Sequence, residues 1–227
     1  MKKAVLYLDI EVYKNWFLVA MLSHDTDKIY HFEIYPGTNL DKVNVLKLIS
    51  QHRVVGFNST NYDLPLLALA LVEGTTTQQI KKASDQIIVE GYKYWDLGLR
   101  PLPCEHVDLM SIAPGTASLK LYGGRIHAPR LQDLPFDPSA SVTPEMRIEL
   151  TRYCDNDLKL TQRLYEKLLP AIELREQLSA KTGINLLSAA DQKIAEKLIE
   201  QDLAGKANNY ANRNTGSRVQ VPTPSFS

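Results

Sequence analysis

The sequence predicts an α/β fold. We expect a mixed five-stranded sheet, three antiparallel strands followed by parallel strands, flanked by helices and followed by a C-terminal helical extension. Three apolar runs joined by short polar connections open the chain, which is typical of an antiparallel meander. A helical pattern then leads to another apolar run, and this strand–helix–strand order indicates parallel pairing. Beyond position 143 the pattern is helical to about position 205.

The first half of the predicted sheet lies near the N-terminus. Its first three strands are expected at 4–12, 16–22 and 28–35. Because the run at 4–12 is apolar at nearly every position, we expect it to be a central strand buried on both faces. A helix at 41–51 and a short buried strand at 54–57 follow.

The middle of the chain is expected to be less regular. An apolar helix is predicted at 64–72, where Pro65 falls in the tolerant first turn, and a second helix is predicted at 75–88. A fifth strand is expected at 105–112. Glycine and proline predict loops in the remaining segments, with one short helix inside the second loop: 91–103, 113–141, and the helix near 118–122.

Three helices are expected in the last part of the chain. Thr143 is a good N-cap with Pro144 in the first helical position. The expected helices run from there to Leu169, from 171 to 181, and from Ser188 to about Gly205. We therefore divide the chain into a main domain at 1–170, a helical annex at 171–205, and at 206–227 a flexible tail or a linker to a further domain.

Composition limits the location and the partners. The 26 basic and 26 acidic residues cancel, which argues against a protein held to nucleic acid by bulk charge. Cys104 and Cys154 lie far apart, so a reduced cytoplasmic protein is expected, or one in the host cytoplasm if the protein is viral. No apolar run suits a membrane span or a signal peptide. The histidines and cysteines form no clustered ligand set, so no zinc site is predicted.

Three short motifs place carboxylates beside expected core positions. Asp9 and Glu11 are two apart in a strand and share a face, where a divalent cation would relieve their repulsion. Taken singly, that pair also fits a solvated strand end. Asp63 follows a buried strand and opens a helix, which a simple N-cap also explains. Tyr153 and Asp157 are four apart and share a helical face bordering the core, or form an ordinary polar face.

Taken together, these motifs resemble the DEDD superfamily of 3′–5′ exonucleases, the DnaQ-like enzymes. The tyrosine four residues before the last acid marks the DEDDy subgroup, which includes proofreading domains of family A and family B DNA polymerases. The histidine subgroup would need His where Arg152 stands. Three further segments are similar to phage replication exonucleases: 118–124, 130–136 and 189–195.

The resemblance implies a ribonuclease H-like fold and two divalent ions, Mg²⁺ or Mn²⁺. It implies that Asp9 bridges both ions, that Glu11 and Asp157 complete one of them, and that Asp63 holds the other through water. Tyr153 would orient the attacking water, since a phenol is a poor base at neutral pH. Two-ion sites of this kind hydrolyse phosphodiesters by in-line displacement.

The expected activity is 3′–5′ exodeoxyribonuclease: hydrolysis of single-stranded DNA from its 3′ end to nucleoside 5′-monophosphates, as in proofreading during viral replication. A DNA polymerase domain or subunit is an expected partner. Asn58 is expected to bond the terminal nucleotide, Phe57 or Tyr62 to stack on a base, and Lys120 to contact phosphate. The alternatives are a 3′–5′ exoribonuclease and a catalytically weak nucleic-acid-binding or polymerase-docking module.

Overall fold

The computed structural model describes residues 3–214, with side chains to residue 204. Contacts divide the chain into two compact units, Met1–Ser188 and Ala189–Ser227. Among the described residues, none of the helices is long and apolar enough to cross a membrane. The strands and helices follow one another in the order β1 (Val5–Tyr13), β2 (Trp16–Ser23), β3 (Ile29–Ile34), α1 (Lys42–Gln51), β4 (Arg53–Gly56), α2 (Asp63–Ala70), α3 (Thr77–Ile88), β5 (His106–Asp108), α4 (Leu109–Ile112), α5 (Leu119–Arg125), α6 (Pro144–Thr182) and α7 (Asp191–Asn214).

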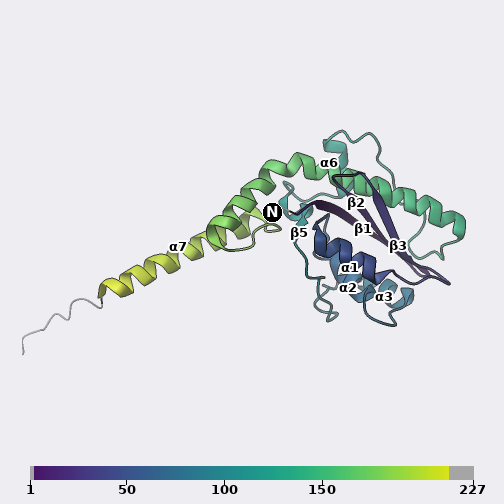
Figure 1. Ribbon diagram of the computed structural model, residues 1–227, viewed down its shortest axis with the longest axis horizontal. Coiled ribbons are helices and arrows are strands. Elements are labelled where there is room, and N and C mark those ends of the chain that lie inside the picture. The colour runs from purple at the N-terminus through teal and green to yellow at the C-terminus, as the bar shows by residue number, and fades with distance from the viewer. Residues whose placement is uncertain (1–2, 215–227) are drawn as a thin grey trace, which may run out of the picture. The chain divides into compact units, whose positions relative to one another are not determined.

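The predicted α/β class and the mixed five-stranded sheet are confirmed. The strand order is β3-β2-β1-β4-β5, so β1 lies at the centre as its apolar character indicated (Figure 1). β1, β2 and β3 pair antiparallel. β4 adds to β1 in parallel, and β5 adds to β4 in parallel. The central strand therefore has hydrogen-bonded neighbours on both sides, which fixes the direction of each of its side chains.

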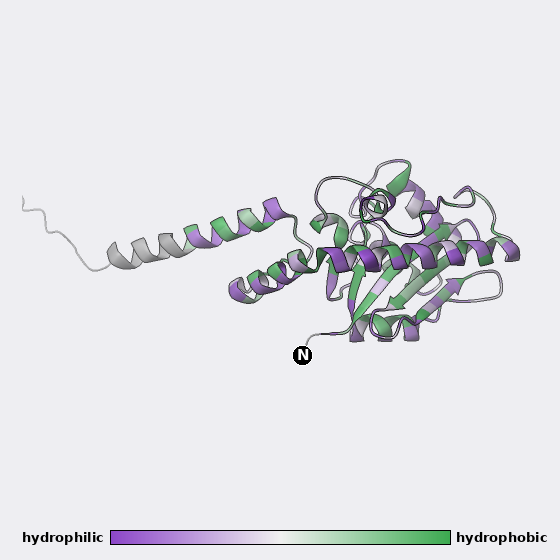
Figure 2. Ribbon diagram, turned by 90° about the horizontal axis from the view of Figure 1, so that it is seen from above, coloured by the Kyte–Doolittle hydropathy of each residue, from purple (hydrophilic) through white to green (hydrophobic). Residues whose placement is uncertain are grey.

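Helices cover both faces of the sheet and enclose two hydrophobic cores. One core joins the sheet to α1, α2 and α3, and the other joins it to α4, α5 and α6. Figure 1 shows α1, α2 and α3 on one side of the sheet and α6 on the other. Figure 2 shows α6 crossing the sheet with hydrophilic residues along its length and hydrophobic strands beside it. Successive residues of β1 therefore alternate between the two cores.

The fifth strand is shorter than the sequence predicted. The run expected as strand at 105–112 divides into β5 and the one-turn helix α4. Asp108 ends the strand by capping α4, since its side chain accepts a hydrogen bond from the backbone N–H of Met110. A short apolar run cannot distinguish strand from buried helix by periodicity alone, and here the capping aspartate decides the boundary.

Two predicted helix ends are wrong. The expected break at Leu169 does not occur, because α6 continues through Pro170 and ends where Gly183 adopts a left-handed conformation. Buried Tyr165 and Ile172 anchor the turns on either side of the proline, so packing outweighs the hydrogen bond that proline cannot donate. The helix expected to end near Gly205 continues to Asn214 as α7. The rest of the expected tail, 215–227, lies outside the described residues.

A buried ion-pair group attaches the C-terminal half of α6 to the sheet. Arg53 is the first residue of β4, and its side chain is only 8 % exposed. Its guanidinium donates to Glu105 at 2.6 Å and to Glu176 on α6. Since a buried cation without its partners is costly, this group ties the far end of α6 to the strand that runs beside β1.

Replacing Arg53 by Met is expected to lower the free energy of unfolding by about 2 kcal/mol, because two partly buried carboxylates, Glu105 and Glu176, lose this cation as a partner. Chemical denaturation monitored by circular dichroism measures the change. Lys42→Met is the matched control, since Lys42 pairs with Glu73, whose side chain is 99 % exposed. Such an exposed pair contributes at most about 1 kcal/mol. Equal losses in the two variants would contradict the anchoring role of Arg53.

Candidate metal centre

β1 directs Asp9 and Glu11 toward α6. The odd-numbered residues Tyr7 and Tyr13 belong to the core beneath α6, whereas the even-numbered residues belong to the core beneath α1 to α3. Asp9 and Glu11 occupy the odd positions between the two tyrosines. Their side chains therefore point from the middle of the sheet to its α6 face, as the spacing predicted.

α6 brings three polar side chains to the same place. Tyr153, Cys154 and Asp157 are buried residues of this helix. The thiol of Cys154 donates to Asp9 Oδ2 at 3.4 Å. One ligand atom from each of Asp9, Glu11 and Cys154 lies within 4.8 Å of the others. This small cluster could hold a metal ion.

Asp63 is the first residue of α2, which packs on the face of the sheet opposite α6. It is 4 % exposed. The N-cap of α2 is Tyr62, which makes no side-chain capping bond, so the simple N-cap explanation of Asp63 is wrong. Burial first, and repulsion from Asp9 second, raise the pKa of Asp63, and the backbone N–H of Ile10 lowers it. The Asp63 carboxylate therefore lies beside β1, close to Asp9.

Burial and mutual repulsion act together on the carboxylates. Burial first, and the charge of Asp157 second, raise the pKa of Asp9 to about 7. The pKa of Glu11 is raised well above its usual value by burial and then by Asp9, Asp157 and Asp63. Neighbouring carboxylates that repel in a buried site favour the binding of a cation or a proton. The four predicted acids thus form one electrostatic group.

Asp157 has a hydrogen-bonding atom without a partner. The residue is 8 % exposed, and burial raises its pKa. Its Oδ1 atom is buried and accepts no hydrogen bond from any described residue. A buried acceptor left without a partner costs about 1–3 kcal/mol. A cation bound among these carboxylates would remove that cost.

Tyr153 stays protonated in this environment. Burial is the main cause of its raised pKa, and the charges of Asp157 and Glu11 raise it further. Its phenol interacts with the Asp157 carboxylate, and this interaction lowers the pKa of Asp157. Because the phenol keeps its proton at neutral pH, Tyr153 can donate a hydrogen bond but cannot act as a base.

Asp108 supports the cluster by holding backbone. Its Oδ1 accepts from the backbone N–H groups of Asn58 and Met110, and its Oδ2 accepts from that of Thr60. Both carboxylate oxygens are thus engaged by backbone. Asp108 thereby fixes the segment that connects β4 to Asp63, and it raises the pKa of Asp63.

The same segment carries two of the predicted nucleic-acid contacts. Phe57 is half-buried against the core beneath α6, with its ring edge-on to Tyr122 at 5.9 Å between centroids. Asn58 has a φ of 59°, in the left-handed region that asparagine tolerates better than most residues. Its side-chain oxygen accepts from Asn61 Nδ2 at 2.9 Å. Nucleotide contacts by Phe57 and Asn58 stay predictions.

Of the other two predicted nucleic-acid contacts, Tyr62 packs in a core and Lys120 lies at the carboxylate cluster. Tyr62 packs against the core beneath α1 to α3 and bonds Ser84 through its hydroxyl at 2.7 Å. Lys120 on α5 lies with Nζ 5.4 Å from the centre of the Tyr153 ring, and it also pairs with the exposed Asp133 at 3.3 Å. The ammonium lowers the pKa of Asp157, so Lys120 is the basic residue placed at the cluster.

Sequence reasoning missed Cys154. Cys154 lies in the apolar stripe of α6, which gives no sign of a ligand, and it is fully buried. The available signal was its spacing: Cys154 lies three residues before Asp157, and residues three apart are neighbours on a helix surface. The stripe and the polar face therefore meet at this residue, and the thiol joins the carboxylates.

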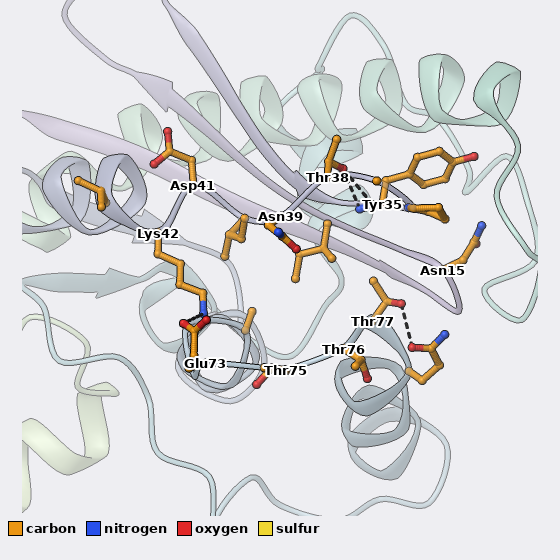
Figure 3. A pocket seen from close by; sticks show the side chains of 18 residues that line it. Asn15, Tyr35, Thr38, Asn39, Asp41, Lys42, Glu73, Thr75, Thr76 and Thr77 are labelled. Carbon is orange, nitrogen blue, oxygen red and sulfur yellow. Dashed lines mark hydrogen bonds and ion pairs between the residues drawn. The ribbon is translucent and has the colours of Figure 1, made fainter.

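A separate cavity of about 850 Å³ lies beside the loop that follows β3 and the connection between α2 and α3. Figure 3 shows Asp41, Lys42 and Glu73 toward one side of it and Tyr35 and Thr38 toward the other. The Lys42 ammonium bonds Glu73 at 3.1 Å. None of the predicted site residues lines this cavity. It is therefore distinct from the carboxylate cluster.

No protein-family model matches the sequence, and no curated protein sequence is significantly similar to it.

Proposed function

We propose that the protein is a metal-dependent 3′–5′ exonuclease of the DEDDy type, with a ribonuclease H-like fold, acting on single-stranded DNA. One observation carries the proposal. The carboxylates of Asp9 and Glu11 on β1, Asp63 on α2 and Asp157 on α6 repel one another as one group, in which the first two are half-buried and the last two buried. The Tyr153 phenol interacts with the carboxylate of Asp157. Hydrolysis of phosphodiesters needs such a group of hard oxygen ligands.

The residues present fit divalent ions. Asp9, Glu11, Asp63 and Asp157 would hold two Mg²⁺ or Mn²⁺ ions, which would supply an activated water and charge stabilisation at the phosphate. The raised carboxyl pKa values and the unpartnered Oδ1 of Asp157 both favour a bound cation. Oxygen ligands are those that hard cations prefer.

The remaining residues position the substrate. Tyr153 donates a hydrogen bond and would orient the water that attacks the last phosphodiester. Lys120, whose ammonium lies beside the Tyr153 ring, would neutralise charge on that phosphate. The leaving group is the 3′ oxygen of the shortened strand, and the product is a nucleoside 5′-monophosphate. A DNA polymerase domain or subunit is the proposed partner, with proofreading as the biological role.

The test is release of mononucleotides from an oligonucleotide labelled either at its 3′ end or at its 5′ end. We expect the 3′ label to leave first, in the presence of Mg²⁺ or Mn²⁺ and not in EDTA. DNA and RNA of the same sequence are compared, because the same chemistry on RNA is the alternative substrate. Release of the 5′ label first, or activity that survives EDTA, would refute the proposal. Strand binding without metal-dependent cleavage would instead support a docking module.

Tyr153→Phe is expected to lower kcat by about 10²-fold, the loss typical of removing one preorganised hydrogen-bond donor. The apparent affinity for the metal ion should change little, because the four carboxylates remain. Steady-state cleavage over a range of Mn²⁺ concentrations separates the two quantities. Tyr62→Phe is the matched control, since that hydroxyl bonds Ser84. A Tyr153→Phe variant as active as Tyr62→Phe would contradict the orienting role.

A further inference from the structure

Cys154 brings a different ligand chemistry to a group of hard oxygen atoms. Its Sγ is fully buried and lies 3.4 Å from Asp9 Oδ2. Thiolate sulfur binds zinc and other thiophilic cations well, whereas Mg²⁺ takes oxygen ligands. The two kinds of cation would therefore use different atoms of the same cluster.

The spacing of the three ligand atoms suits one small cation. With Zn–S of about 2.3 Å and Zn–O of about 2.1 Å, sulfur and oxygen bound to one tetrahedral ion lie roughly 3.6 Å apart. The observed separation of 3.4 Å is close to that value. The carboxylate of Glu11 completes a set whose atoms lie within 4.8 Å of one another. If side-chain rotations moved these ligand atoms closer together by about 1 Å, all three could contact one zinc ion.

A fourth ligand is available from α6. Asp157 lies one helical turn beyond Cys154, and its buried Oδ1 has no hydrogen-bond partner among the described residues. Its charge raises the pKa of both Asp9 and Glu11, which shows that the carboxylate faces them. This unpartnered atom points to a bound cation independently of the thiol.

We infer that Asp9, Glu11 and Cys154, completed by Asp157, form a mixed carboxylate–thiolate site that selects thiophilic divalent cations such as Zn²⁺, and that Cys154 is its specificity-determining ligand. On binding, the sulfur–metal bond replaces the S–H bond, and the proton is released to solvent. Because the same carboxylates are those of the proposed nuclease, the inference rests on that function in one respect: Zn²⁺ bound here would compete with Mg²⁺ and arrest cleavage.

The experiment uses Cd²⁺ as a spectroscopic probe and the full-length protein without Mg²⁺. Cadmium bound to thiolate gives a sulfur-to-metal charge-transfer absorption in the ultraviolet, which carboxylate ligands do not give. We expect this band in the wild type and in Cys104→Ser, where the half-buried thiol outside the cluster is removed. We expect no band in Cys154→Ser. Calorimetry with Zn²⁺ should show affinity in Cys154→Ser lower by at least about tenfold.

Two variants distinguish the loss of a metal ligand from the loss of the fold. Serine is close to cysteine in size, and thermal unfolding verifies that Cys154→Ser is folded before titration. A second variant, Asp9→Asn, should weaken cadmium binding while keeping the thiol. A band that persists in Cys154→Ser, or that disappears in Cys104→Ser, would overturn the inference. If the cadmium band does not depend on Cys154 but Mg²⁺-dependent cleavage is intact, only the thiolate-site inference is refuted and the nuclease proposal stands. A cadmium band without any cleavage would refute the nuclease proposal alone.

Discussion

Replacing Asp9 by Asn and Glu11 by Gln together is expected to lower kcat/KM for DNA cleavage by at least about 10³-fold, since a bound metal supplies several kcal/mol of transition-state stabilisation. The amides keep the shape of the side chains but remove the charges that would hold the cations. The measurement is release of a 3′ label with Mn²⁺ at several concentrations. Activity within tenfold of the wild type would exclude these carboxylates as metal ligands.

The matched control for the double variant is Asp155→Asn. Asp155 also lies on α6, but its carboxylate accepts from His31 at 2.6 Å instead of facing the cluster. Its removal should leave cleavage nearly unchanged. The double variant should also unfold at a higher temperature than the wild type in EDTA, because the repulsion is gone. Loss of activity accompanied by lower stability would indicate misfolding in place of lost ligands.

Without metal, the protein is expected to lose stability as pH rises from about 4 to about 7. The pKa of Asp9 is raised from 3.8 to about 7, so the folded protein retains a proton that the unfolded chain has released. The contribution of Asp9 to the free energy of unfolding is fully present below its pKa in the unfolded chain. It is lost as pH rises through its pKa in the folded protein, by about 4 kcal/mol in total. Glu11 and Asp63, whose pKa values are also raised, act in the same direction.

Chemical denaturation in EDTA across this pH range measures the effect, with Asp9→Asn as the control for every other titrating group. The difference between wild type and Asp9→Asn should shrink toward low pH. Added Mn²⁺ should restore the wild type at pH 8, by about 2.7 kcal/mol at a hundredfold excess over the dissociation constant. It should restore Asp9→Asn much less. A wild type whose advantage over the variant grows with pH in EDTA would contradict the repulsion among the carboxylates.

The central part of the fold was predictable because local patterns and sheet geometry agree there. The apolar run that became β1 identified the middle of the sheet, and the period of two in a strand placed Asp9 and Glu11 on one face. The spacing of Tyr153 and Asp157 likewise gave their common helical face. The helix start at Thr143 was marked by its capping side chain, which the structure confirms.

The errors arose where tertiary contacts override local signals. A proline such as Pro170 ordinarily ends a helix. Here the packing of buried residues on both sides of it stabilises α6, so the helix continues. The carboxylate of Asp108 also accepts from the backbone N–H of Asn58, fifty positions away in sequence, which no local pattern indicates. Cys154 was missed for a similar reason. The residue of β1 that lies opposite this buried thiol is set by tertiary packing, and it could as well have been a leucine as the carboxylate of Asp9.

The distance along the chain between the two halves of the cluster has a consequence for biosynthesis. Cys154 and its partner Asp9 are 145 positions apart. A ribosome adding about 5–20 residues per second would expose β1 well before α6 emerges. Any activity of this cluster therefore cannot appear on a nascent chain until α6 has docked.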